Sequence, residues 1–359
     1  MKNNLYLFFL ICSSLNYSTS LAQSPVDNLP EHVTMITGFG ERPDWSHDGK
    51  KVIFVGKQFG DVFEYDVETK FVKCLTLHYQ HYGYTRVNYL SNGDILLSGP
   101  IQQYDMKVKE ERGRARSMSY LSILSKEMDG PPTPLGVVAA EGPAVSRNQL
   151  KIAWEVAHSQ DPLRLNEGQS IMFVADIEYQ NGVPRLARQR QFFDSRDMPF
   201  TLRHVETQDF VPPADEKLVA TVYRKDLTTN TETFLIDVKT SEFENMSKSP
   251  DTYDEAEGVF PDGKYTTTET GPSNGRNFPM VDIYKLILDG SGKKERLTYF
   301  SEYEGYKATQ SVISDDGKKM VFQLGKSGDE AGQGHGLFIM DLEKAKVSRG
   351  GAESQRKVK

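Results

Sequence analysis

Oxygen-bearing and cationic side chains recur at one place ahead of six similar segments of this sequence. When the segments are superposed on a shared tight turn, the residue four positions before Trp45 or its equivalent is Glu41, Thr85, Glu141, Glu206, Glu255 or Thr309. The residue that follows it is Arg42, Arg86, Gly142, Thr207, Ala256 or Gln310. Carboxylates gathered in a ring can coordinate a hard cation, and carboxylates beside arginines can hydrogen-bond a sugar. The alternative is that all of them are ordinary solvated loop residues.

Two histidines extend this candidate chemistry. His204 and Glu257 lie close to the recurring positions, and we expect both at the same mouth. His335 ends a glycine-rich loop near the C-terminus, with Asp329 and Glu330 upstream as further oxygen donors. Its imidazole could ligate a metal or act as a general base. A lone loop histidine is usually solvated, so that reading stays open, and the sequence fixes no set of metal ligands.

The elements that would position these residues are β-hairpins. Each segment has two apolar stretches joined in most copies by Asn-Gly, Asp-Gly or a similar turn. Asn-Gly and Asp-Gly adopt the positive φ angles of a two-residue hairpin turn. The six copies span residues 43–54, 87–97, 143–154, 209–220, 258–267 and 312–322.

A second pair of strands follows most of these hairpins, which gives four strands per repeat. Four-stranded repeats of roughly 40 to 65 residues are typical of β-propeller blades, because one blade cannot bury both of its faces alone. The sequence therefore predicts an all-β fold, a six-bladed β-propeller of four-stranded antiparallel blades. The last repeat lacks an outer strand, and we expect residues 33–37 to complete that blade and close the ring.

The termini and the charge narrow the function classes. Residues 1–22 read as a secretory signal peptide with cleavage after Ala22, too short in its apolar core to span a membrane. We expect a single propeller domain over residues 31–347 and a disordered basic tail over residues 348–359. The net charge of −7 disfavours nucleic acid, and the basic run at 112–116 reads as a solvated cluster. The protein is therefore expected to be periplasmic or secreted.

The repeats resemble those of a known family. Residues 42–54, 61–66 and 75–76 follow the pattern of the TolB-type β-propeller repeat, a relative of the WD repeat, and so do residues 314–322 and 337–342. The resemblance covers nearly the whole chain after the signal peptide. More distantly, the chain is similar to oligogalacturonate lyases, which implies a divalent metal held by histidines and a glutamine. No motif fixes the counterparts, which would come from His78, His81, His204, His335 and Gln208 or Gln310.

Two functions remain open, and the sequence does not decide whether the protein is an enzyme. The leading interpretation is a TolB-like binding or assembly module for a glycan or for a periplasmic or outer-membrane protein. Its expected ligand-binding residues are Glu41, Arg42, Arg86, Glu141, Glu206, Glu255, Glu257 and Gln310. The alternative is a metal-assisted uronate lyase with calcium or manganese as its metal and with His335, His204 and Arg86 as catalytic residues. A convergent set of histidine, arginine and tyrosine would favour the enzyme, and a smooth acidic mouth would favour binding.

Overall fold

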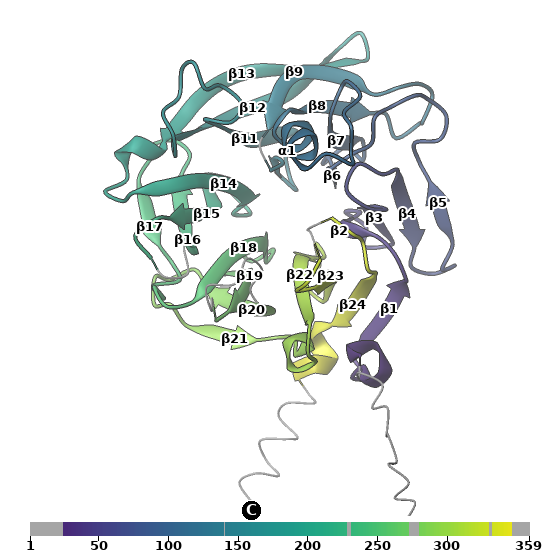
Figure 1. Cartoon of the computed structure of the whole chain (residues 1–359). Helices are drawn as coiled ribbons and strands as arrows, with labels where there is room; N and C mark the ends of the chain where they lie inside the picture. Colours follow the sequence, from purple (N-terminus) through teal and green to yellow (C-terminus); the bar gives the residue numbers. More distant parts are fainter. Residues whose placement is uncertain (1–23, 140, 228–230, 273–279, 330–331, 347–359) are drawn as a thin grey trace, which may run out of the picture.

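Six antiparallel sheets form a closed ring in the computed structural model, which describes residues 24–139, 141–227, 231–272, 280–329 and 332–346. Figure 1 shows the sheets arranged as blades around a central opening. Each blade has four strands, and in each the chain enters at the innermost strand. This arrangement confirms the predicted six-bladed propeller. The predicted signal peptide (residues 1–22) and the predicted tail (residues 348–359) lie outside the described residues.

The first three blades use the following strands. Blade 1 contains β2 (Glu41–Trp45), β3 (Lys51–Val55), β4 (Val62–Asp66) and β5 (Val72–Cys74). Blade 2 contains β6 (Arg86–Tyr89), β7 (Ile95–Gly99), β8 (Ser119–Leu124) and β9 (Thr133–Ala139), with helix α1 (Lys109–Ser117) between its second and third strands. Blade 3 contains β10 (Ala144–Val145), β11 (Lys151–Ala157), β12 (Ser170–Gln180) and β13 (Val183–Asp194).

The remaining blades complete the ring. Blade 4 contains β14 (Leu202–Phe210), β15 (Lys217–Arg224), β16 (Thr231–Asp237) and β17 (Phe243–Asn245). Blade 5 contains β18 (Tyr253–Val259), β19 (Tyr265–Gly271), β20 (Asp282–Ile287) and β21 (Lys294–Arg296). Blade 6 contains β22 (Tyr306–Ile313), β23 (Lys319–Lys326), β24 (Leu337–Asp341) and, as its outer strand, β1 (Val33–Thr37). Short 3-10 helices cover Pro25–Asn28, Ser195–Asp197 and Phe300–Glu302.

The inner hairpins close through a local hydrogen-bond pattern that the sequence encodes. In blade 1 the Ser46 amide donates to the carbonyl of Lys51 at 3.0 Å, and the Ser46 hydroxyl accepts from the Lys51 amide at 2.9 Å. Gly49 ends this turn at φ 67°, a conformation that side-chain-bearing residues rarely adopt. The same bonds link Ser314 and Lys319 in blade 6. These turns pair two apolar strands, so that each blade carries apolar side chains on both faces of its sheet.

Apolar side chains from neighbouring blades form shared cores. One cluster joins Trp45, Val52 and Phe54 of blade 1 to Val321 and Leu337 of blade 6, all of them almost fully buried. Because each blade offers apolar side chains on both faces, burial is complete only when a blade stands on either side. The ring must therefore close to be stable.

The closure uses the N-terminal strand, as the sequence predicted. Strand β1 pairs antiparallel with β24, with Val33 opposite Met340 and Thr37 opposite Leu337. Figure 1 shows this first strand beside the last one. The pairing covers the outer edge of β24 and ties the two ends of the propeller together.

We predict that deleting residues 31–37 lowers the melting temperature by at least about 5 °C and promotes association. The deletion removes the ladder bonds of β1, uncovers the edge of β24 and exposes part of the blade 6 core. Calorimetry and sedimentation velocity measure the two effects. A monomeric deletion variant with an unchanged melting temperature would contradict this account of closure.

Candidate ligand site at the propeller mouth

Backbone bulges aim polar side chains into the central channel. The inner strands β2, β14, β18 and β22 each shift register against their neighbours, whereas β6 pairs regularly with β7. A bulge adds one residue to a strand and turns its side chain away from the regular alternation. Arg42 and Gln310 lie in bulges at φ 51° and 52°, in the left-handed region that is costly for residues other than glycine. Together with Gln208 and Glu257, they line the channel.

Each of these four strands is held by a polar side chain from the blade before it. The acceptor oxygen belongs to a residue at the same position of the second strand in each case, and it accepts a hydrogen bond from a backbone amide at or beside the bulge. The four contacts are Gln323 Oε1 to the Arg42 amide at 2.7 Å, Glu155 Oε2 to Thr207 at 3.2 Å, Thr221 Oγ1 to Ala256 at 3.0 Å and Glu269 Oε1 to Gln310 at 2.8 Å. They satisfy amides that the interrupted ladder would leave unpaired.

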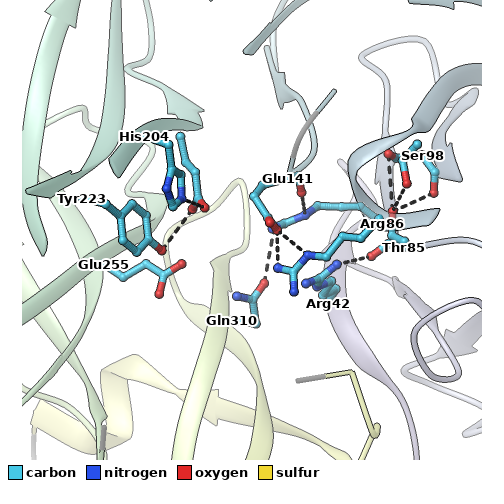
Figure 2. Close-up of polar contacts among 12 residues, drawn as sticks. Arg42, Thr85, Arg86, Ser98, Glu141, His204, Tyr223, Glu255 and Gln310 are labelled. Atoms are coloured by element: carbon cyan, nitrogen blue, oxygen red, sulfur yellow. Dashed lines mark hydrogen bonds and ion pairs between the residues drawn. The ribbon is translucent and has the colours of Figure 1, made fainter. Parts of the chain in front are cut away.

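Three arginines gather on the side of blades 1 and 2, and we call Arg42, Arg86 and Arg116 the arginine cluster. Figure 2 shows Arg42 and Arg86 on this side of the mouth. Arg86 Nε donates to the carbonyl of Glu141 at 2.8 Å, and Arg42 Nη1 donates to the carbonyl of Thr85 at 2.6 Å. Arg116 forms an ion pair with the Glu141 carboxylate, with Nε 3.1 Å from Oε2. Three cations thus converge around one carboxylate.

Burial and mutual repulsion set the ionisation of this cluster. Burial, followed by the charges of Arg86 and Arg116, lowers the pKa of Arg42 to about 10. Burial alone would raise the pKa of Glu141, but Arg116 and then Arg42 outweigh it and hold that pKa at about 2. Glu141 is therefore ionised at neutral pH, and the cluster keeps a surplus of positive charge that favours an anion.

Helix α1 explains how Arg116 reaches the site. Glu110 and Glu111 lie in its first turn and Arg114 and Arg116 in its last, so each sign of charge lies at the end of the helix dipole that stabilises it. Ala115 is fully buried and fixes the helix against the propeller. The sequence predicts Arg116 to be part of a solvated charge cluster at residues 112–116. This prediction is wrong for Arg116, because burial of Ala115 orients the helix so that the Arg116 side chain reaches Glu141.

Carboxyl groups gather on the opposite side, from blades 4 and 5, and we call Glu206, Glu255, Glu257 and Glu269 the carboxyl cluster. Glu206 accepts a hydrogen bond from Tyr223 at 3.2 Å and lies 2.8 Å from His204 Nε2. Glu255 accepts from Tyr253. The His204 and Tyr223 rings stack with centroids 4.1 Å apart and an interplanar angle of 15°. Figure 2 shows His204, Tyr223 and Glu255 facing the arginines across the mouth.

Two members of the carboxyl cluster, Glu255 and Glu257, have raised pKa values. Burial, and then the charges of Glu269 and Glu206, raises the pKa of Glu255 to about 8. Burial and the charges of Glu269 and Glu255 raise the pKa of Glu257 well above its usual value. Burial lowers the pKa of His204 and the Glu206 carboxylate raises it, with a net increase. This wall can donate hydrogen bonds and exchange protons, whereas the arginine wall attracts negative charge.

The structure brings most of the predicted residues to one mouth. The strand pairing gives the same equivalences as the superposed turns, since Trp45, Phe210, Val259 and Ile313 occupy matching positions. Glu41 is an exception, because it is only 1% exposed, and one of its oxygens has no hydrogen-bond partner among the residues that the structure describes.

The other histidines lie apart from His204. His335 Nε2 is 2.6 Å from Asp329, and the residue forms a bridge with Gly40 beside blade 1. His78 and His81 contact Gly130 and Asp61. Glu330 lies outside the described residues. In the part of the chain that the structure describes, no three His, Cys, Asp or Glu side chains are arranged to hold a metal ion.

Sequence reasoning missed seven residues of the site and its supports, namely Arg116, Tyr223, Tyr253, Glu155, Thr221, Glu269 and Gln323. A signal existed for the last four. The same position of the second strand holds a polar residue in five of the six blades, as Ser98, Glu155, Thr221, Glu269 and Gln323. A buried polar residue at a repeated position in a blade implies a repeated hydrogen-bonding role.

Comparisons with known proteins support the fold. No family model and no curated protein matches the chain. Among solved structures, TolB from Agrobacterium tumefaciens is similar with a TM-score of 0.50 and 14% identity, over 74% of this chain and 77% of that one. An oligogalacturonate lyase in complex with manganese has a TM-score of 0.50 and 12% identity, over 87% and 79% of the two chains. A gluconolactonase from Xanthomonas campestris has a TM-score of 0.50 and 11% identity, over 86% and 88%.

These likenesses show the propeller fold alone, because the identities are low and the same fold carries different functions. The resemblance to TolB and oligogalacturonate lyase propellers that the sequence suggested is thus confirmed for the fold. Among the described residues, no helix is both long and apolar enough to cross a membrane. The function must be argued from the site itself.

We predict that Glu255→Gln alters the dependence of stability on pH. The folded state holds the Glu255 proton up to a pKa of about 8, whereas the unfolded chain releases it near the usual value of 4.5. The folded state therefore binds more protons between these values, and the free energy of unfolding falls as the pH rises through this window. Glutamine cannot ionise, so the variant should lose that part of the slope and melt roughly 2 °C or more above wild type at pH 8.5.

Scanning calorimetry from pH 5 to pH 9 measures this difference. Glu244→Gln, on the exposed part of strand β17, is the matched control and should keep the wild-type slope. Superimposable profiles for wild type and Glu255→Gln would show that Glu255 is not held protonated by its surroundings.

Proposed function

We propose that the protein is a glycan-binding propeller whose mouth takes a carboxylate-bearing sugar, such as a uronate in a polysaccharide. The observation that carries the proposal is the arginine cluster facing a wall of hydrogen-bonding and proton-holding groups. A uronate presents one carboxylate and several hydroxyls on a compact ring, which matches a mouth with one cationic and one polar side.

The arginine cluster suits a carboxylate for physical reasons. The guanidinium group is planar and donates two parallel hydrogen bonds to a carboxylate. Burial makes three neighbouring cations costly, as the lowered pKa of Arg42 indicates, so an anionic ligand would relieve their repulsion. Glu141 neutralises part of the charge through Arg116 and leaves Arg42 and Arg86 nearer the channel.

The opposite wall suits sugar hydroxyls. Gln208 and Tyr223 carry donors and acceptors there, and the stacked His204 and Tyr223 rings offer an apolar edge beside polar atoms. Binding sites commonly combine a few placed polar groups with aromatic surface. The proposed location is the periplasm or the cell exterior, in keeping with the signal peptide predicted from residues 1–22.

We predict that oligogalacturonates bind wild type and that Arg86→Gln weakens this binding by about 10- to 100-fold, because a charge-assisted contact is lost. Isothermal titration calorimetry with trigalacturonate measures the effect. Arg185→Gln, on the exposed strand β13, is the charge-matched control and should bind as wild type does. If trigalacturonate gives no heat and no thermal stabilisation with wild type, the glycan proposal fails and a protein partner becomes the favoured ligand.

A second candidate function, elimination from a uronate, is supported by the convergence of His204 and Tyr223 with the arginine cluster. The arginines would neutralise the carboxylate and thereby acidify the neighbouring C5 proton. His204, in its neutral form, would accept that proton while the C5–H electron pair forms the C4–C5 double bond, because burial raises the pKa of Tyr223 and keeps it a phenol. The C4–O bond breaks, and its oxygen leaves with a proton returned from the site.

We predict that, if the protein is a lyase, absorbance near 235 nm grows on pectic substrates and that His204→Ala reduces the rate by a factor of about 10² to 10⁴. Both proteins are assayed with and without added calcium or manganese. His335→Ala is the comparison variant, because His335 contacts Asp329 outside this convergence. A wild-type protein that binds trigalacturonate without any growth in absorbance would exclude the lyase and leave the binding function.

A further inference from the structure

Gln310 bridges the two walls of the mouth from a fixed backbone position. It lies in the bulge of β22 on blade 6, between the arginine cluster and the carboxyl cluster (Figure 2). Its Oε1 accepts from Arg86 Nη1 at 3.4 Å, and its Nε2 donates to Glu257 Oε1 at 3.1 Å. Its backbone amide is held by Glu269 at 2.8 Å. The backbone is therefore anchored, and the side chain reaches across the channel opening.

The contact with Arg86 is the weakest link of this bridge. A distance of 3.4 Å lies beyond the usual range for N–H···O bonds, and the acceptor is a neutral amide. A carboxylate in the same position would add its own negative charge to the interaction and make a shorter, stronger bond with the guanidinium. The Gln310 amide oxygen thus stands where one carboxylate oxygen of an anionic ligand would be held.

We propose that the Gln310 side-chain oxygen competes with a ligand carboxylate for the same Arg86 donor, and that this competition sets the affinity of the mouth for anionic ligands. This inference rests on the proposed function and deepens it. An entering carboxylate displaces the Gln310 oxygen, and the side chain rotates away while Glu269 keeps its backbone in place. A neutral sugar has no group that gains enough from Arg86 to displace the amide.

The amide is suited to this role, whereas a carboxylate is not. A glutamate at position 310 would present a tethered anion to Arg86 at high effective concentration and would exclude a free one. A shorter side chain could not reach Arg86 and would leave the Arg86 donor available to a ligand carboxylate. Asparagine is the cleanest shorter variant, because it tolerates positive φ better than most residues and keeps the amide chemistry.

The two substitutions should therefore act in opposite directions. Gln310→Glu is expected to weaken trigalacturonate binding by about 10- to 100-fold. Gln310→Asn is expected to strengthen it by roughly threefold to tenfold, since one weak competing bond is removed. Binding of neutral galactotriose should stay at its wild-type level in both variants. Gln191→Glu, on the exposed face of β13, adds the same charge elsewhere and should leave trigalacturonate binding unchanged.

Isothermal titration calorimetry with trigalacturonate, galactotriose and citrate on the full chain tests the inference, with circular dichroism confirming the fold of each variant. Opposite shifts for the two variants support it. If wild type binds citrate in this Gln310-dependent way but not trigalacturonate, Gln310 keeps its role and the glycan proposal fails. If trigalacturonate binds wild type, Gln310→Glu and Gln310→Asn equally, the inference is overturned and the proposed function stands. Absence of binding by both carboxylates overturns both.

Discussion

One repeated contact supports both the ring and its mouth: a polar side chain accepts a hydrogen bond from an amide at or beside an inner-strand bulge of the next blade. Each inner-strand bulge interrupts the ladder of its own blade and would leave an amide unpaired. The second strand of the preceding blade supplies the acceptor, as Gln323 does for Arg42 and Glu269 does for Gln310. The strain that aims a side chain into the channel is therefore offset by the contact that joins two blades.

This arrangement explains why buried charges are tolerated at the centre of the propeller. Burial raises the pKa of Glu155 to about 7, yet its two oxygens accept from the amides of Glu141 and Thr207 and so have a structural task. The arginine and carboxyl clusters then stand on opposite sides of the mouth, with Gln310 bonded to both. A cationic side that faces a side with protonated carboxyl groups supports the proposed ligand, which carries one carboxylate and several hydroxyls.

The predictable part of the structure follows from local chemistry. The six blades were predictable from the Asp-Gly turns and the apolar strands. The closure by β1 was predictable from the missing outer strand of the last repeat. The same superposition gave the positions of Arg42, Glu206 and Gln310 at one mouth. It misplaced Arg116 as solvated, because a charged run looks the same whether a helix turns one member inward or not. His335 contacts Asp329 and Glu41 is buried, and their proposed roles stay predictions.

The sequence by itself determined where the chain turns, which residues alternate toward a core, and that the repeats must form a ring to bury their faces. Only the tertiary structure decided which charges meet. Arg42 contacts Gln323 across 281 residues, and Arg86 contacts Gln310 across 224. Turn geometry and strand alternation act over a few residues, whereas these contacts exist only because ring closure brings blade 6 beside blade 1 and within reach of blade 2. The balance of burial and opposite charge that sets each pKa at the mouth arises at the same step.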